Sequence, residues 1–164
     1  MNDSAVGQAA IATPLGTMRL ATDGRAILAL EFDATATTTL SFAAQKLADA
    51  VARRLDAYFE GQRVAFDFAL APSGTPFQQS VWRALCGIPY GETVSYAEIA
   101  RRVGRPSAVR AVGAANGANP IAIVIPCHRV IGTNGTLTGY GGGLDRKRAL
   151  LLLEAPAPFA RFAA

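Results

Sequence analysis

Histidine and cysteine are scarce in this sequence, and their scarcity limits the chemistry that it supports. The chain has one histidine, His128, and two cysteines, Cys86 and Cys127, that lie 41 positions apart. Neither cysteine belongs to a CxxC pair and no second histidine is present, which argues against a zinc site. We therefore expect no metal ion, and thiols that stay reduced in the cytosol.

Long hydrophobic runs and a basic leader are also missing. No apolar run approaches the roughly 20 residues of a membrane span, and Met1 to Ser4 contain no basic residue, so we do not expect a signal peptide. The composition, 51% hydrophobic and 17% charged, is typical of a globular protein. At 164 residues the chain has room for one or two small domains. We expect a cytoplasmic protein.

Charge is unevenly distributed along the chain. Residues 1–72 contain six basic and eight acidic residues, a net charge of −2, whereas residues 73–164 contain ten basic and four acidic residues, a net charge of +6. The change falls in the segment 71–76, whose proline, serine and glycine are typical of a linker. We therefore predict two domains, residues 1–72 and 73–164. The basic balance of the second indicates a nucleic-acid partner, although a solvated surface would give a similar composition.

The first predicted domain resembles a small α+β scaffold. Segments 17–22 and 26–32 are apolar or alternating and flank Asp23-Gly24, which is a strong hairpin signal. We expect a further strand at 11–13, a helix over 41–60 from its apolar spacing, and another strand over the alternating residues 65–69. This half contains no histidine or cysteine, so we expect no chemistry there.

The second predicted domain is mostly helical. Thr75, Pro76 and Gln78 form a capping box that predicts a helix to about residue 85, with Trp82 and Cys86 as core candidates. A second capping box, at 95–98, predicts a short helix ending at 104, and another helix follows over 107–116.

Two short helices joined by a tight turn fit either a helix-turn-helix or an ordinary helical hairpin. The basic charge of this half favours the helix-turn-helix. Its second helix carries Arg110 among small residues, which favours contact with DNA shape and phosphates over base-specific hydrogen bonds.

Cys127 and His128 are the strongest candidates for chemistry. A thiol needs a neighbour that lowers its pKa before it is a useful nucleophile at neutral pH. The apolar residues 121–125 predict a buried strand that Pro126 ends, so we expect the pair at the floor of a pocket. Adjacent side chains of a strand point to opposite faces, so either Pro126 turns the chain or a water bridges thiol and ring. A cysteine after an apolar run is also common in cores, and that interpretation stays open here.

These motifs together resemble the O6-alkylguanine-DNA alkyltransferase family. The similarity covers nearly all of residues 76–154, and the PCHRV block in this company is highly specific. The N-terminal half is similar mainly in its TPLG turn at 13–16. The matching motifs are FQQ at 77–79, IPYG at 88–91, SY at 95–96, RAVG at 110–113, NP at 119–120, IPCHRVIG at 125–132, GY at 139–140 and GGL at 142–144.

The resemblance implies both a fold and a set of catalytic residues. The fold is α/β (α+β), with a small ribonuclease-H-like N-terminal domain and a mainly helical, winged-helix-like C-terminal domain that contains the helix-turn-helix. Cys127 would accept the alkyl group, and His128 would activate it through a water while Glu154 holds the ring. Asn119 would shape the active-site turn, and Tyr96 would protonate or polarise the departing guanine.

The resemblance also implies residues that contact DNA and the base. Arg110 would enter the duplex in place of the flipped nucleotide. The other implied DNA contacts are Gln78, Tyr96, Arg105 and Thr133, and the base pocket would be lined by Tyr140, Gly141 and Gly142. Family members with a structural zinc carry its Cys and His ligands in the N-terminal half, where this chain has neither.

We therefore expect a DNA repair protein that moves a methyl or alkyl group irreversibly from O6-alkylguanine in duplex DNA to Cys127. O4-alkylthymine is a possible second substrate. We expect a monomer that needs no cofactor and that can bind DNA cooperatively. The alternatives are a lesion-binding protein without transfer activity, and a cysteine hydrolase that uses Cys127 and His128. A related non-enzymatic group has tryptophan at the reactive position, so a cysteine at position 127 favours transfer.

Overall fold

A computed structural model describes residues 6–36 and 39–163 of the chain. The expectation drawn from Met1 to Ser4 lies outside the described residues. The predicted α/β class is confirmed, because helices and two small sheets together build the chain. The chain divides into two compact units, Met1–Ser73 with Pro120–Ala122, and Gly74–Asn119 with Ile123–Ala164. Among the described residues, no helix is long and apolar enough to cross a membrane.

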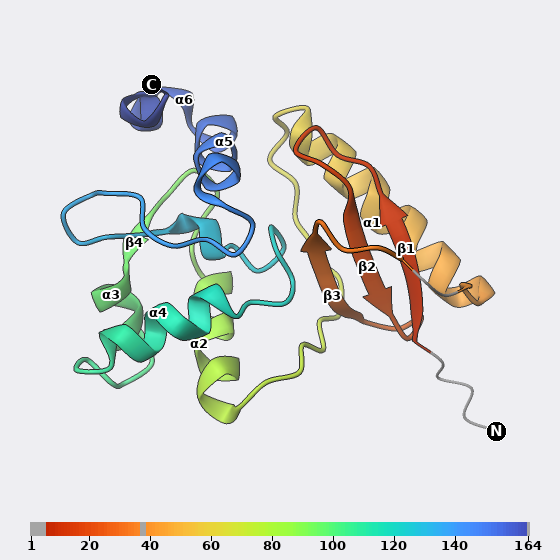
Figure 1. Cartoon of the computed structure of the whole chain (residues 1–164), viewed down its shortest axis with the longest axis horizontal. Coiled ribbons are helices and arrows are strands. Elements are labelled where there is room, and N and C mark those ends of the chain that lie inside the picture. The colour runs from red at the N-terminus through yellow and green to blue at the C-terminus, as the bar shows by residue number, and fades with distance from the viewer. Residues whose placement is uncertain (1–5, 37–38, 164) are drawn as a thin grey trace. The chain divides into compact units, whose positions relative to one another are not determined.

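The first unit is a three-stranded antiparallel sheet with one long helix on its face (Figure 1). Strands β1 (Gly7–Ile11), β2 (Met18–Thr22) and β3 (Ile27–Phe32) pair in chain order, which confirms the predicted hairpin. The predicted strand at 11–13 is displaced, because β1 ends at Ile11. Helix α1 (Phe42–Phe59) is capped by the Ser41 side chain and confirms the helix predicted over 41–60. Its buried face packs toward β1 and β2.

Two predicted strands are wrong. Residues 65–69 do alternate in burial, with Phe66 and Phe68 partly buried, but only Leu70 forms a bridge, to Ile27. The alternating sequence therefore predicted correctly which side chains of residues 65–69 are partly buried. It did not predict that these residues lack a paired strand along their length. Residues 121–125 form one bridge, from Ile121 to Leu30, and then turn, with Ile123 in the left-handed region at φ 71°.

The second unit is mainly helical. The first of its helices, α2 (Pro76–Cys86), confirms the first predicted capping box, because the Thr75 and Gln78 side chains each accept the other residue's backbone N–H. The second box is half formed, since Ser95 accepts the Glu98 N–H whereas the Glu98 carboxylate pairs with Arg101 and Arg102. The elements of the unit are α2 (Pro76–Cys86), β4 (Val94–Ser95), α3 (Tyr96–Arg102), α4 (Val109–Gly117), η1 (Cys127–Arg129), β5 (Val130–Ile131), α5 (Leu144–Glu154), α6 (Pro156–Phe159) and η2 (Ala160–Phe162).

Helices α3 and α4 are the two short helices predicted from the sequence, and α2 packs against both. Trp82 on α2 is buried and donates from Nε1 to the Ala115 carbonyl oxygen at 2.8 Å. Cys86 is exposed, so its interpretation as a core residue is wrong: it stands at the last residue of α2, where the helix leaves the core. The end of the chain also packs more than its sequence indicates, because Phe159 is buried against Ile131 and Leu151.

Candidate active site

Pro126 turns the chain immediately before the candidate nucleophile. Its backbone angles (φ −83°, ψ 62°) are those of an inverse γ-turn, in which the Cys127 N–H donates to the Ile125 carbonyl at 2.8 Å. The next turn is a 3₁₀ helix, η1, closed by the Arg129 N–H on the Pro126 carbonyl at 3.0 Å. Of the two geometries that the sequence left open, the turn at Pro126 is therefore present. Cys127 and His128 are both buried on it.

Two asparagines at the end of α4 hold this turn in place. Asn119 donates from Nδ2 to the Ile125 carbonyl at 2.8 Å, and Asn116 donates to the Cys127 carbonyl at 3.3 Å. The backbone on both sides of Pro126 is thereby fixed by side chains from one helix end. Asn116 is fully within the core, and sequence reasoning did not single it out.

Glu154 is the centre of a buried ionic network. Its Oε1 lies 2.7 Å from His128 Nε2, and both side chains are inaccessible to solvent. Arg129 donates two charge-assisted hydrogen bonds to the same carboxylate, from Nη2 to Oε1 at 2.8 Å and from Nε to Oε2 at 2.9 Å. The Gly91 N–H adds a bond to Oε2 at 3.2 Å, and Arg129 also donates from Nη1 to the Ile88 carbonyl at 2.7 Å.

The network fixes the protonation of the histidine. Although burial acts to raise the pKa of Glu154, the hydrogen bonds and charges of His128 and Arg129 hold that pKa far below its usual value, so the carboxylate is ionised. An ionised carboxylate only accepts, so the ring proton must lie on Nε2 and leaves Nδ1 as an acceptor. Burial lowers the pKa of His128 despite the carboxylate. The resting ring is therefore neutral, and its buried Nδ1 has no hydrogen-bond partner among the described residues.

The resting thiol is also neutral. Burial raises the pKa of Cys127, while a hydrogen bond from the Asn119 side chain and the charge of Lys147 act in the opposite direction. The thiol therefore depends on a base to remove its proton at the moment of reaction. His128 Nδ1 is the unoccupied base next to it in the chain.

Lys147 is a buried cation that sequence reasoning missed. Its Nζ donates to the carbonyls of Thr138 at 2.9 Å and Gly139 at 3.3 Å, and it lies 5.8 Å from the centre of the Tyr96 ring. Burial lowers its pKa to about 8, and a thiolate at Cys127 would act in the opposite direction. A signal was present, because residues 147, 150, 151 and 154 share one face of α5 and all four are buried.

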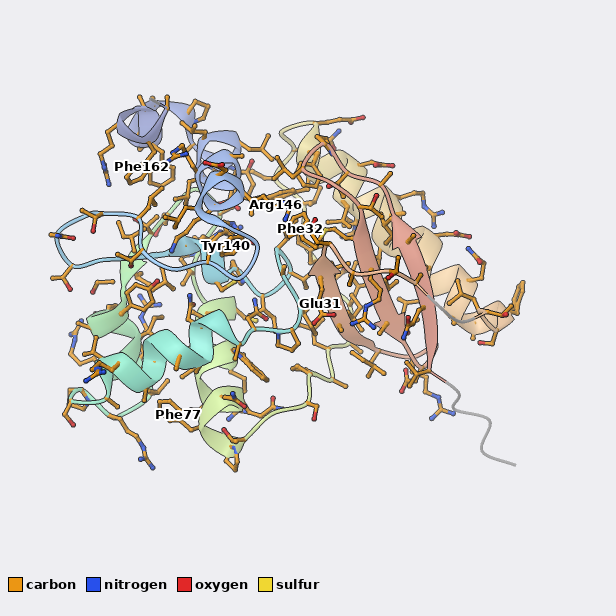
Figure 2. All side chains as sticks on the ribbon, in the orientation of Figure 1. Glu31, Phe32, Phe77, Tyr140, Arg146 and Phe162 are labelled. Carbon is orange, nitrogen blue, oxygen red and sulfur yellow. The ribbon has the colours of Figure 1, made fainter. Side chains whose placement is uncertain are left out.

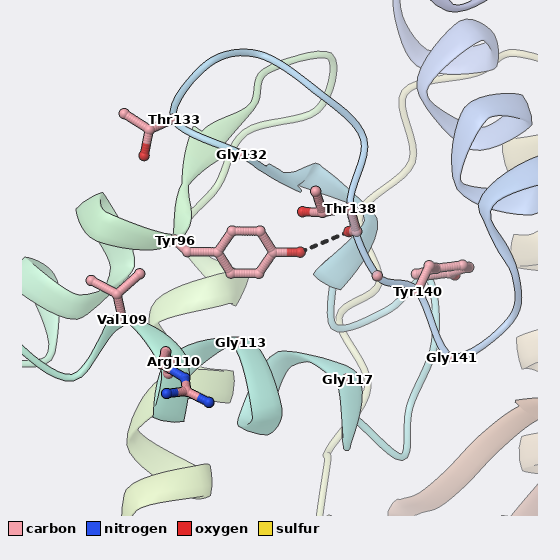
Figure 3. Close-up of a pocket in the computed structure, with 11 residues that line it drawn as sticks. Tyr96, Val109, Arg110, Gly113, Gly117, Gly132, Thr133, Thr138, Tyr140 and Gly141 are labelled. Atoms are coloured by element: carbon pink, nitrogen blue, oxygen red, sulfur yellow. Dashed lines mark hydrogen bonds between the residues drawn. The ribbon is translucent and has the colours of Figure 1, made fainter.

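A pocket of about 670 Å³ adjoins this network. In Figure 3 the Tyr96 side chain points toward Thr138, whose carbonyl accepts from the Tyr96 hydroxyl at 2.9 Å, and Arg110 lies below it on α4. Cys127 is not among the lining residues, so it is not the floor of the pocket. Burial is the main cause that raises the pKa of both Tyr96 and Tyr140, and the thiolate form of Cys127 would raise both further. The lining residues are Tyr96, Val109, Arg110, Gly113, Gly117, Gly132, Thr133, Thr138, Gly139, Tyr140 and Gly141.

The pocket brings together some of the predicted DNA and base contacts, and leaves others apart. Gln78 and Arg105 do not line it. Gln78 serves in the capping box of α2, and Arg105 lies 5.8 Å from the centre of the Phe77 ring near the same helix end. Gly142 also lies outside the lining, where its carbonyl accepts from Arg146 Nη1 at 3.2 Å. The Tyr140 hydroxyl is buried without a hydrogen-bond partner among the described residues, and burial raises its pKa well above the usual value.

The described residues include no group of three or more His, Cys, Asp or Glu side chains placed to hold a metal ion. The fold and the site together define an α/β protein whose helical unit places one buried thiol, a histidine–carboxylate–arginine network and a tyrosine-lined pocket side by side. Two family models match this chain: the 6-O-methylguanine DNA methyltransferase DNA-binding domain over residues 76–156, and the ribonuclease-like domain of the same protein over residues 8–72. The chain belongs to the O6-alkylguanine-DNA alkyltransferase family.

Known relatives agree with this assignment. A methylated-DNA–protein-cysteine methyltransferase of Methanosarcina barkeri is 65% identical over 63% of this chain and 65% of its own length. A protein of the same name from Mycobacterium tuberculosis is 62% identical over 66% of this chain and 68% of its own length. The sequence match thus spans about two thirds of these relatives. The crystal structure of Mycobacterium tuberculosis OGT in complex with DNA has a TM-score of 0.79 at 49% identity, covering 94% of this chain and 98% of that one.

Proposed function

We propose that this protein repairs DNA by moving a methyl or alkyl group from O6 of guanine in a duplex to its own Cys127, once per molecule. The observation that carries the proposal is the buried Cys127 turn, which has a neutral His128 beside it and a fixed Glu154 behind the ring. The family membership and the DNA-bound relative support DNA as the partner. We expect the protein to act as a monomer without metal or cofactor.

The chemistry is an in-line displacement at the alkyl carbon. A water links the Cys127 thiol to His128 Nδ1, which takes the thiol proton as the sulfur attacks. The S–C bond forms while the bond from carbon to O6 breaks, and its electron pair leaves with guanine. Tyr96 assists by protonating or polarising the departing base, which ends as ordinary guanine. Glu154, which Arg129 holds in place, keeps the imidazole oriented and stabilises its charged form, whereas the charge of Arg129 itself disfavours that form.

The reaction is irreversible because the Cys127 thiolate is a poor leaving group from the alkyl carbon of the thioether. One molecule therefore repairs one lesion. This stoichiometry separates the proposal from that of a hydrolase, which would turn over.

The pocket beside the network is the proposed site of the flipped base. A stacked base does not present its O6 substituent to a buried thiol, so the nucleotide must leave the helix. Tyr140 offers a buried hydroxyl for hydrogen bonding, and Gly141 adds no side chain to the lining beside the Gly117 carbonyl oxygen. Lys147 fixes the same loop through its bonds to the 138 and 139 carbonyls.

The helix-turn-helix supplies the proposed DNA contacts. Arg110, exposed on α4 at the pocket edge, would fill the space of the flipped nucleotide. Thr133 on the opposite loop, with Gln78 and Arg105 near the start of α2, would contact the backbone. The domain of residues 73–164 would thus bind DNA and carry out the transfer, and the domain of residues 1–72 would act as a scaffold.

Intact-mass measurement after incubation with duplex DNA that contains O6-methylguanine tests the proposal. We expect one methyl group per protein, located on Cys127 by peptide mapping, and no gain in a Cys127→Ser variant that still binds the duplex. Cys86→Ser, which removes the exposed thiol, is the matched control and should keep full transfer. DNA binding without mass gain would instead indicate a lesion-binding protein, and multiple turnover would indicate a hydrolase.

A further inference from the structure

A second pocket, of about 370 Å³, lies on the loop that also borders the base pocket. Residues 132, 133, 138 and 139 of this loop line the base pocket, and residues 135–137 line the second one. The loop is thus a shared wall between the two. The lining residues of the second pocket are Gly135, Thr136, Leu137, Arg148, Arg161 and Phe162.

Arg161 has two contacts beside this pocket. Its guanidinium carbon lies 4.5 Å from the centre of the Phe162 ring, and Nη1 donates to the Pro158 carbonyl at 3.3 Å. Phe162, labelled in Figure 2, stacks in turn on the buried Phe159 at 6.1 Å between ring centres. Through Phe162, the exposed Arg161 side chain is therefore connected to the buried Phe159.

Nη2 of the Arg161 guanidinium faces Gly135 in the 132–139 loop. A Cβ built at Gly135 would lie 3.8 Å from Arg161 Nη2, and Gly135 itself has φ +80°, so the absence of a side chain leaves this side of the guanidinium open. A planar guanidinium with open donors matches the oxygens of a phosphate.

The pocket is positively charged. Arg148 is its second cation, and its Nη1 bond to Asp145 at 2.8 Å involves a carboxylate that is 99% exposed, so this pair is weak. Within the described part of the chain, no carboxylate lines the pocket itself. Two arginines beside an apolar floor of Leu137 and Phe162 favour an anion over a cation or a purely apolar ligand.

We propose that this pocket binds a backbone phosphate of the DNA strand that passes over the 132–139 loop, outside the base pocket. The inference rests on the proposed function, because it takes duplex DNA as the partner. Arg161 is the main donor to this phosphate and Arg148 adds charge. The contact would fix the loop from its outer side while Lys147 fixes it from inside.

The salt dependence of duplex binding tests this contact. Each phosphate contact contributes about −0.9 to the slope of log K against log salt concentration. Arg161→Gln should therefore make the slope about 0.9 less negative, whereas Arg25→Gln, an exposed arginine of the first unit, should leave it unchanged. A slope equal to wild type in a folded Arg161→Gln protein would overturn the proposal. Thermal unfolding checks that each variant is folded.

Single uncharged methylphosphonate linkages, scanned along both strands around the lesion, locate the phosphate. At one linkage, neutralisation should weaken binding of the wild type several-fold and leave Arg161→Gln unaffected. If every linkage weakens both proteins equally, Arg161 does not bind the backbone. Transfer from free O6-benzylguanine to Cys127, measured in parallel by mass, should be equal in both proteins. Its absence in the wild type, together with no transfer from duplex O6-methylguanine, would refute the proposed function, whereas normal transfer with an unchanged slope would refute this phosphate site alone.

Discussion

The two units differ most in what they bury. In the described part of the first unit, Thr22 is the one buried polar side chain, and it is satisfied within its own hairpin by bonds to the Ala26 carbonyl and the Gly24 N–H. The second unit buries an asparagine, a histidine, a lysine and a glutamate, namely Asn116, His128, Lys147 and Glu154. All four are bonded to the Cys127 turn, to its network or to the pocket loop.

This difference indicates that the functional chemistry is located in the second unit. Burying a charge costs free energy unless it is paired, and even a well-paired ion pair rarely stabilises a fold more than apolar side chains would. The first unit shows that a sheet and helix of this size need no such groups. The concentration of buried charge in the second unit is therefore better explained by chemistry at Cys127 than by stability.

The largest expected effect comes from removing the charge of Glu154. Glu154→Gln leaves Arg129 without a counter-charge and His128 without a strong acceptor, so the free energy of unfolding should fall by about 3–5 kcal/mol. Because the carboxylate that orients the general base His128 is lost, transfer to Cys127 should slow by about 10²–10⁴-fold. Single-turnover transfer from free O6-benzylguanine measures the rate, and chemical denaturation measures the stability.

The pH dependence distinguishes this effect from a simple packing defect. The pKa of Glu154 is lower in the folded protein than in the unfolded chain, so its stabilising contribution is complete above the unfolded value of about 4.3 and is lost as the pH falls below it. The stability difference between wild type and Glu154→Gln should therefore narrow on acidification from pH 6 to pH 3. Glu92→Gln, an exposed carboxylate of the same unit, is the control. A pH-independent difference would contradict the assigned charge state.

The next largest expected effect comes from a substitution in the core of the first unit. Leu55 is fully buried on α1, so Leu55→Ala should lower the free energy of unfolding by about 2–5 kcal/mol. Below the unfolding transition, the rate of transfer from the free base should equal that of wild type, because no group of the first unit takes part in the chemistry. Lys46→Ala on the exposed side of the same helix should change neither quantity. A slowed reaction in folded Leu55→Ala would end the division of roles between the units.

The sequence was sufficient for α1 to α4 and insufficient for α5, whose start has no side-chain cap, and for the segments between the helices. Capping residues and apolar spacing are local signals, and they placed α1 and α2 within a residue or two. The strand prediction for residues 121–125 was wrong because an apolar run does not distinguish a strand from a buried turn. No local signal marks the left-handed backbone conformation of Ile123.

The site was predictable to a similar degree. Cys127 and His128 follow from their adjacency and uniqueness, whereas the position of Glu154 beside them came only from the family resemblance. Lys147 was within reach of periodicity, since it shares the buried face of α5 with Glu154. The two hydrogen bonds from Arg129 to Glu154 depend on how α5 packs against η1. This is a long-range contact that no local sequence pattern encodes.

The smallest expected effect separates base extrusion from chemistry within the second unit. Arg110 lies on the exposed side of α4 and at the pocket edge, away from the buried network. Because unstacking a base costs a few kcal/mol, Arg110→Ala should slow transfer from duplex DNA by about 10-fold while transfer from free O6-benzylguanine stays at the wild-type rate. Arg101→Ala on neighbouring α3, where the side chain is 68% exposed, is the control for lost charge. Equal slowing on both substrates would place Arg110 in the chemical step, and the boundary between DNA handling and buried chemistry would then have to be redrawn inside this unit.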